Sequence, residues 1–450
     1  MMPSTAYLLG APLVLLLPVY LFRRLRPWGA ILSAVVLALE TYACLRLPPD
    51  VGWVVYGRAV ALSEGGRIAL AWIAGASALL AVAHAFATSD SSPAVFLLPA
   101  VSFAGLALAV GPFPLAFLTL WIAMLLAAFL FRASSVAACR GLSQFLALTA
   151  VGIPAFLLAA VLLARSLAVG PDEVPPWNSI AILIVAGSAA WLSFFPFHAW
   201  LPGLVGTGQP LAAGWVAGIV QPLVLVTLAR VMQVYPELAA QPQAQHIVLI
   251  AAAVSAAVGA IGAAFARRPG RMLGYTALTA MAPLFVVTYA SAGISTSFWM
   301  AALAYSAAVV LASIGLAGVE RDGKPVTLSD WSAAARGRGA SVALLLSGAL
   351  SLCGLPLGVG FWAHITLRAN LPAVPAAALL ILQAAPLVAA IGWWRVLRAS
   401  AQGQEGKTQP LSRAAQAFFW ALALLSAALF VWPVPLARLA EAFARAFGSL

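Results

Sequence analysis

The fold is decided by the stretch VAGSAAWLSFFPFHAWLPGL at residues 185–204 and its continuation VGTGQPLAAGWVAGIVQPLVLVTLAR at 205–230. Two apolar runs, each long enough to cross a bilayer, are joined here by a short Gly-rich link. Pro196 interrupts the first run, and His198 follows two residues later. A proline inside a helix removes a backbone hydrogen bond, and in hydrocarbon this is tolerated only where protein or water satisfies the freed carbonyl. The stretch therefore predicts a broken membrane helix that lines an ion or proton path.

The composition of the whole chain indicates the same class of protein. Of 450 residues, 64% are hydrophobic and 8% are charged, and the mean hydropathy is +1.02. Water-soluble chains are about 25% charged, so we interpret residues 1–450 as a single membrane domain of a multi-pass, all-α protein. The net charge of +12 is assigned to arginines beside anionic lipid, not to nucleic-acid binding. Three separated cysteines argue against a disulfide framework or an iron–sulfur cluster: Cys44, Cys139 and Cys353.

Hydrophobic runs of about 20 residues predict fourteen crossings. They are expected near 5–22, 28–46, 67–88, 92–110, 113–131, 142–164, 178–202, 210–233, 246–265, 272–293, 295–318, 341–365, 371–394 and 415–436. An even number places both termini on one side of the membrane. Arg23, Arg24 and Arg26 follow the first run, the reverse of a secretory signal, so both termini are predicted on the outer face. The loops assigned to the inside then hold sixteen of the 24 basic residues.

A second broken helix is expected near Pro356 and His364, so the two halves of the chain share a pattern. Paired broken helices in corresponding positions point to a transport site between repeats. Between them, the segment from Glu320 to Arg338 is expected to be a cytoplasmic linker with an amphipathic piece on the membrane surface.

Three segments of the chain resemble one family. They are WLSFFPFHAWLP at 191–202, RRPGRMLGYTALTAMAPL at 267–284 and SLCGLPLGVGFWAH at 351–364. The family is that of the antiporter-like membrane subunits of respiratory complex I, membrane-bound hydrogenases and Mrp-type antiporters, and subunit N of NADH-quinone oxidoreductase is the most similar type. The resemblance implies fourteen helices. Three N-terminal helices (about 5–88) precede two inverted five-helix repeats (about 92–233 and 246–394), in which helices 7 and 12 are broken, and a last helix follows (about 415–436).

The resemblance also implies residue positions that this chain has changed. Where the family pattern places a glutamate on helix 5 and a lysine on helix 7, this chain has Ile122 and Trp191. The lysines of helices 8 and 12 are replaced by Gln221 and His364. Trp, Gln and Ile cannot titrate, so the resemblance supports fold and assembly more strongly than ion pumping.

Five residues remain candidates for a proton or ion path: His198, His364, Gln221, Glu40 and Tyr275. Imidazole titrates near neutral pH, and a lone carboxylate in a membrane helix is costly enough to suggest a role. Each has a structural alternative. His198 would cap carbonyls freed by Pro196, His364 would lie at the membrane interface, Gln221 would bond between helices, and Glu40 would reach the headgroups. Arg230, near a helix end, is expected to extend to the membrane interface.

Three functions are compatible with these residues. The first is a membrane subunit of a complex I-like or hydrogenase-like assembly that couples redox chemistry in partner subunits to proton or cation translocation in the inner (cytoplasmic) membrane. The second is a scaffold of such a complex that no longer conducts. The third is the membrane subunit of an antiporter-like or inorganic-carbon uptake system. The chain has no catalytic motif, so we expect any NADH-quinone oxidoreductase activity, with its flavin, iron–sulfur or nickel centres, in partner subunits.

Overall fold

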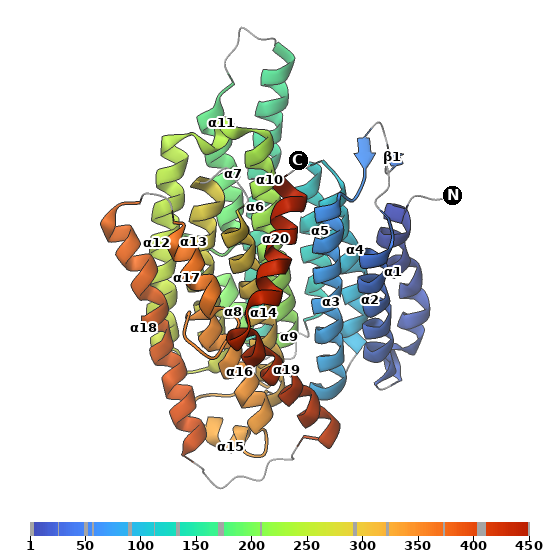
Figure 1. The fold of residues 1–450 in the computed structure, drawn as a ribbon, viewed down its shortest axis with the longest axis vertical. Helices are drawn as coiled ribbons and strands as arrows, with labels where there is room; N and C mark the ends of the chain where they lie inside the picture. The colour runs from blue at the N-terminus through green and yellow to red at the C-terminus, as the bar shows by residue number, and fades with distance from the viewer. Residues whose placement is uncertain are drawn as a thin grey trace.

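The computed structural model describes residues 4–25, 27–48, 53–55, 58–88, 92–111, 113–131, 136–169, 175–207, 209–290, 295–320, 324–371, 374–402 and 411–448. Helices dominate these residues (Figure 1). The first six are α1 (Ser4–Leu21), α2 (Trp28–Arg46), α3 (Glu64–Ala87), α4 (Leu97–Ala109), α5 (Leu115–Ala128) and α6 (Val136–Val169). Next come α7 (Trp177–Trp191), α8 (Trp200–Val205), α9 (Pro210–Trp215), α10 (Gln221–Val234) and α11 (Pro236–Ala239). The rest are α12 (Pro242–Phe265), α13 (Pro269–Ala290), α14 (Thr296–Val319), α15 (Trp331–Ala335), α16 (Gly339–Leu352), α17 (Phe361–Ala369), α18 (Ala376–Ala401), α19 (Arg413–Val431) and α20 (Val434–Gly448).

The prediction of an all-α, multi-pass membrane fold is confirmed. Each of the fourteen expected ranges overlaps one helix or two consecutive ones, and both expected breaks are present, between α7 and α8 and between α16 and α17. Among the described residues, eleven helices are long and apolar enough to cross a bilayer. Three shorter apolar helices account for the remaining ranges: Leu115–Ala128, Trp177–Trp191 and Gly339–Leu352. The number of crossings therefore stays a prediction, as does the inverted-repeat relation.

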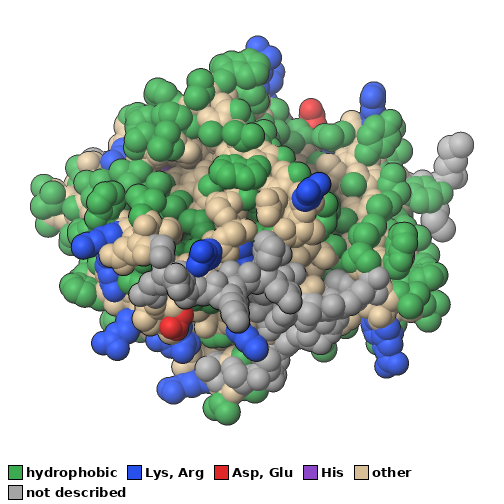
Figure 2. Space-filling view, turned by 90° about the horizontal axis from the view of Figure 1, so that it is seen from below, with side chains coloured by type: hydrophobic (Ala, Val, Ile, Leu, Met, Phe, Trp, Pro, Cys, Tyr) green, Lys and Arg blue, Asp and Glu red, His purple; other side chains and the backbone are tan. Residues whose placement is uncertain are grey.

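Two elements were not expected from the sequence. The connection after α2 holds a short antiparallel hairpin, β1 (Trp53–Val55) and β2 (Arg58–Val60), with Trp53 opposite Val60. After α19 the chain continues as α20, which lies in front of α14 in Figure 1. Both ends of the described chain lie at the end of the molecule opposite α15. Figure 2 shows arginine and lysine side chains projecting around the α15 end, and few acidic ones.

Helix α14 is the centre of the packing and is almost entirely buried. Its closest approach is to α16, where glycines let the two backbones touch. A Cβ added at Gly348 would lie 2.4 Å from the carbonyl oxygen of Ala308, and one at Gly315 would lie 2.3 Å from the Leu345 nitrogen. Small residues at such crossings are typical of membrane helices, which associate through close van der Waals packing.

Four arginines satisfy the exposed carbonyls at the ends of neighbouring helices. Arg67 donates to the Cys44 carbonyl at the end of α2, Arg230 to Ala107, Leu108 and Val110 at the end of α4, Arg338 to Val319 at the end of α14, and Arg395 to Ala264 and Ala266 at the end of α12. The last carbonyls of a helix lack partners within it and attract positive charge. Arg230 thus binds the end of α4, and its extension to the membrane interface stays a prediction.

The segment between α14 and α16 is docked on the protein, which corrects the expectation of an amphipathic surface piece. Trp331 is fully buried, and its indole N–H donates to Ser400 Oγ of α18 over 2.8 Å. The amide of Leu328 donates to the Arg267 carbonyl. Glu320, only 3% exposed, accepts a 3.0 Å hydrogen bond from the Val326 amide through Oε1. Burial raises the pKa of this carboxyl to about 8, although Arg268 and the Val326 amide oppose the rise.

The glycine contact between α14 and α16 predicts the effect of a single methyl group. We expect Gly348→Ala to lower the free energy of unfolding by about 1–3 kcal/mol, because the added carbon overlaps the Ala308 carbonyl. Gly10→Ala in α1 is the matched control, since no atom lies within 4 Å of its added Cβ. Thermal midpoints of the two purified variants in detergent measure the difference. Equal midpoints would contradict the close packing.

Glu320 predicts a pH dependence of stability. An unfolded glutamate titrates near pH 4.3, whereas the folded carboxyl titrates at about 8. Between these values the unfolded chain releases a proton that the folded chain keeps, so the free energy of unfolding falls as the pH rises from about 5 to 8. Glu320→Gln retains the acceptor for Val326 and should reduce this slope. Thermal midpoints of the wild-type chain and of Glu320→Gln, measured from about pH 5 to 8, test this. The same dependence on pH in both proteins would contradict the prediction.

Candidate functional site

The two broken helices end with the same backbone design. In the first, the Phe194 amide donates to the Ala189 carbonyl, and in the second the Leu355 amide donates to the Leu350 carbonyl. In each break the second residue after the helix is left-handed, with φ of 61° at Ser193 and 67° at Gly354. This is the hydrogen-bonding pattern of a Schellman C-cap, which satisfies carbonyls that a simple helix end would expose. The two halves thus share a break of the same kind.

Ser193 occupies a conformation that usually favours glycine, and its side chain explains why. Its Oγ donates to the His198 carbonyl over 3.1 Å and accepts from the Leu201 amide over 3.4 Å. The amide of Phe195 is satisfied from outside the break by Ser255 Oγ of α12. These bonds tie the turn between α7 and α8 to itself and to α12, and Pro196 is left exposed.

His198 does not cap carbonyls, so its structural alternative is wrong. Its ring is half-buried and stacks on Phe195 with the centroids 6.0 Å apart, and its Nδ1 is buried without a hydrogen-bond partner among the described residues. Its own carbonyl is satisfied by Ser193. A role for this imidazole in proton transfer stays a prediction.

The first half of the molecule is closed by aromatic side chains. Trp191, fully buried at the end of α7, lies against Phe156 of α6 and Phe117 of α5, with ring centroids 4.8 and 5.7 Å away. The two phenylalanines stack on each other at 3.9 Å. The indole N–H donates to the Thr149 carbonyl over 2.8 Å, and Gly152 leaves room for the ring. Where the family pattern has a lysine on helix 7, this chain therefore has Trp191, packed in an apolar cluster.

Ile122 is not the α5 residue that packs on this cluster. It follows Phe117 by five residues, which places it about 140° around the helix, and it is only half-buried. The position at which the resemblance implies a glutamate therefore lies on a different side of α5 from Phe117.

Polar groups lie at the corresponding place beside the second break, Gln221 from the first repeat and Tyr305 from the second. Gln221 is fully buried, and its Oε1 accepts a 3.0 Å hydrogen bond from the hydroxyl of Tyr305 on α14. Its Nε2 has no partner among the described residues. A π-helical turn, Val216–Val220, comes directly before Gln221 and separates α9 from α10. Such turns occur often at functional sites because they rotate the following side chains.

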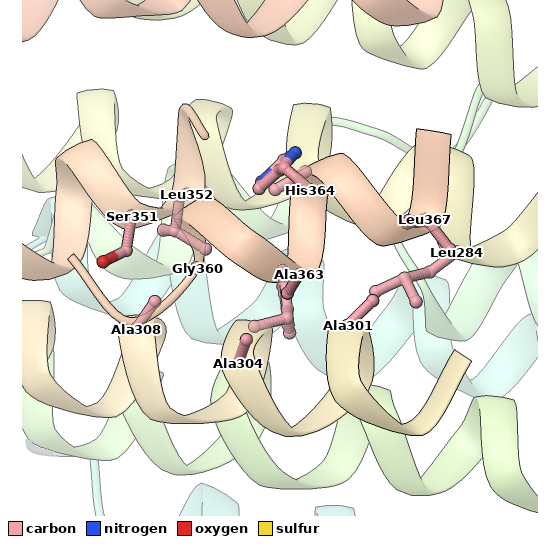
Figure 3. A pocket seen from close by; sticks show the side chains of 12 residues that line it. Leu284, Ala301, Ala304, Ala308, Ser351, Leu352, Gly360, Ala363, His364 and Leu367 are labelled. Atoms are coloured by element: carbon pink, nitrogen blue, oxygen red, sulfur yellow. The ribbon is translucent and has the colours of Figure 1, made fainter. Parts of the chain in front are cut away.

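Tyr305 also borders a small cavity beside the second break. The cavity of about 20 Å³ is enclosed by α13, α14 and both parts of the broken helix, and its wall includes Ser351 and His364. That volume holds about one water molecule. In Figure 3 Ala363 points toward Ala304 of α14, whereas the His364 ring stands at the cavity's other edge. The imidazole lies beside the Leu352 carbonyl, within the break.

The structure does not bring the other predicted residues to this place. Tyr275 packs its ring on Gly262 of α12, where a Cβ would lie 2.7 Å from the ring. Glu40 is buried on α2, a helix that packs on α1, α3 and α4, and its Oε1 has no hydrogen-bond partner among the described residues. Pro356, like Pro196, is exposed in its turn.

Tyr305 was missed from the sequence. In LAYSAAVV at 303–310 it is one of two adjacent hydroxyl side chains within an apolar run, and no spacing relates it to Gln221, 84 positions earlier. A polar side chain inside an otherwise apolar helix is the only signal that could have indicated it.

Comparisons with known proteins agree with this architecture. Residues 121–387, more than half of the chain, match the model of the NADH:quinone oxidoreductase/Mrp antiporter transmembrane family. A subunit N of NADH-quinone oxidoreductase from Caulobacter sp. (strain K31) is 27% identical over 287 residues, 59% of this chain and 57% of that protein. The matched stretch thus spans little more than half of that relative.

Two solved structures share the fold. A chain of the membrane-bound sulfane sulfur reductase, an archaeal respiratory membrane complex, superposes with a TM-score of 0.83 at 16% identity and covers 98% of this chain and 97% of its own. A chain of respiratory complex I from Thermus thermophilus gives 0.80 at 20% identity, with 96% and 98% covered.

The aromatic cluster predicts a large cost for removing its central ring. We expect Trp191→Ala to lower the free energy of unfolding by about 3–5 kcal/mol, because a buried indole leaves a cavity and the Thr149 carbonyl loses its donor. Trp394→Ala is the control, since that side chain is 65% exposed on α18. Denaturation of both variants in mild detergent compares them. A similar loss in both would show that Trp191 is not packed in a closed core.

Proposed function

Because the chain belongs to the NADH:quinone oxidoreductase/Mrp antiporter transmembrane family, we propose that it is a membrane subunit of a complex I-like or hydrogenase-like assembly. In this proposal, redox chemistry in partner subunits drives proton or cation movement through the polar groups beside the second break. Apart from Gln221, the first half serves as a rigid, non-conducting scaffold. Flavin, iron–sulfur or nickel centres belong to the partners.

The observation that carries the proposal is the contrast between the two breaks. Beside the second one, the Gln221–Tyr305 hydrogen bond lies next to a water-sized cavity that His364 borders. Beside the first one, the rings of Phe117 and Phe156 fill the space around Trp191. Protons cross an apolar region only where polar groups or water form a continuous chain, so of the two breaks the second offers a route.

Three side chains have different roles in this proposed proton route: His364, Gln221 and Tyr305. Neutral imidazole has one N–H donor and one acceptor, so His364 can take a proton on one side and release it on the other. Gln221 does not titrate, but it orients the Tyr305 hydroxyl, whose lone pairs stay available to a cavity water. The unpaired Nε2 of Gln221 offers a donor to a second water. The carrier is thus histidine in place of the family's lysine.

A scaffold without any conduction is the second candidate, and the aromatic cluster of the first half favours it. The rings that pack on Trp191 are apolar and its indole N–H is already hydrogen-bonded, so this cluster itself offers no group that exchanges protons. For the chain to be a scaffold, the groups beside the second break must also fail to conduct protons.

We also infer the orientation of the chain in the inner membrane. The α15 end carries the arginine and lysine side chains seen in Figure 2, and cytoplasmic loops are enriched in basic residues. That end is assigned to the cytoplasm, and both termini to the outer face.

The proposed route predicts which side chains proton movement needs. We expect His364→Ala to abolish proton uptake by sealed vesicles that contain the intact complex. Tyr305→Phe removes one hydrogen bond of about 1–1.5 kcal/mol and should slow uptake roughly tenfold. Tyr289→Phe is the matched control and should leave uptake unchanged, because that hydroxyl donates to the Leu238 carbonyl elsewhere in the molecule.

The measurement is the uptake rate relative to the redox rate of the same preparation. If His364→Ala and Tyr305→Phe assemble and pump like the control, the groups beside the second break do not conduct and the scaffold function holds. The metal and flavin content of the co-purified partners separates a respiratory complex from an uptake system.

A further inference from the structure

Helix α20 has two unlike faces. Phe443 and Phe447 stack on Trp299 of α14, with ring centroids 4.5 and 4.9 Å apart. On the opposite face are three charged side chains, all exposed: Arg438, Glu441 and Arg445. Their spacing of three and four residues places them in one stripe along the helix. We call these three residues the charged stripe.

The contacts of α20 place this stripe at membrane depth. Phe447 lies against Gly65, in the first turn of α3, and Phe443 borders the same small cavity as Ala69 and Ile73. Helix α20 therefore runs antiparallel to α3, and its N-terminal part lies deeper. Arg438 precedes Phe443 by five residues, about 7.5 Å along the helix, which brings it level with the middle of α3. Because α3 is a 24-residue candidate span, Arg438 lies near the bilayer centre.

Arg438, at this depth, is not suited to face lipid. A charge at the centre of a membrane helix costs about 2.5–3.5 kcal/mol on insertion scales. None of the stripe residues forms a hydrogen bond or ion pair within the described part of the chain. The outward face of α18 shows what lipid contact requires, since Leu380, Leu387 and Ile391 are exposed there. Figure 1 shows α20 uncovered on the flank of the molecule, in front of α14.

We propose that the charged stripe of α20 is a docking surface for another membrane subunit of the same assembly. The partner presents carboxylates to Arg438 and Arg445, because the stripe has two positive groups and one negative. A donor on the partner faces Glu441. Pairing of these groups removes the cost of placing them in hydrocarbon. The inference rests on the proposed function, which requires partner subunits, and it adds where one of them binds and by which chemistry.

The test is charge reversal in the full complex. In the double variant Arg438→Glu with Arg445→Glu, we expect the amount of that subunit co-purified in mild detergent to fall at least about tenfold, the equivalent of 1.4 kcal/mol. Arg165→Glu, at an exposed arginine near the end of α6, is the matched control and should retain the wild-type amount. Thermal midpoints check that each chain folds. If charge reversal prevents folding, Arg438→Gln with Arg445→Gln is used instead.

A crosslink identifies the occupant. Glu441→Cys, in a chain with Cys139→Ser, should crosslink to a helix of a different membrane subunit near an acidic residue. Crosslinking to lipid or to a second copy of this chain would overturn the proposal, as would full retention of the subunit by the charge-reversed chain. A wild-type chain that retains no membrane partner would overturn the proposed function as well, so the two failures are distinguishable.

Discussion

In a bilayer every backbone polar group must find its partner within the protein, and this constraint organises the molecule. Two helices are interrupted in mid-chain, and each interruption closes with the same hydrogen bond back over five residues, at Phe194 and at Leu355. At intact helix ends, arginine side chains donate hydrogen bonds to the last carbonyls, as Arg230 does for α4. The Ser193 side chain makes two further hydrogen bonds, one as donor and one as acceptor. The backbone hydrogen bonds of both breaks are thus made within the protein. Other polar side chains beside the breaks are not needed for this and can take part in transport.

The two halves have used this shared design differently. Around the first break, Trp191 and its phenylalanine neighbours form an aromatic cluster in which the indole N–H is already hydrogen-bonded. Around the second, Tyr305 and Gln221 are joined to each other and lie next to a space of one water molecule. The surroundings of the first break have the properties of a rigid support and those of the second the properties of a polar route. An assembly can use both, because a neighbouring subunit needs a firm surface as well as a coupled pathway.

Much of the architecture followed from the sequence, whereas the site followed only in part. Helix ranges and both breaks were predictable, because about 20 apolar residues and an interrupting proline are local signals. The bond between Tyr305 and Gln221 was not, since it joins residues 84 positions apart. The partners of Arg230 were not predictable for a similar reason, because its acceptors lie on α4. The linker around Trp331 was taken for surface, because burial against α18 leaves no mark in composition. Non-local contacts decided each of these cases.

The central claim is that polar continuity exists at the second break and not at the first. It is tested most directly by locating ordered water in a high-resolution cryo-electron microscopy map of the chain within its complex. The account predicts water between Tyr305 and His364, and none within the ring cluster of Trp191. A dry second cavity, or a file of waters passing through the first half, would contradict it.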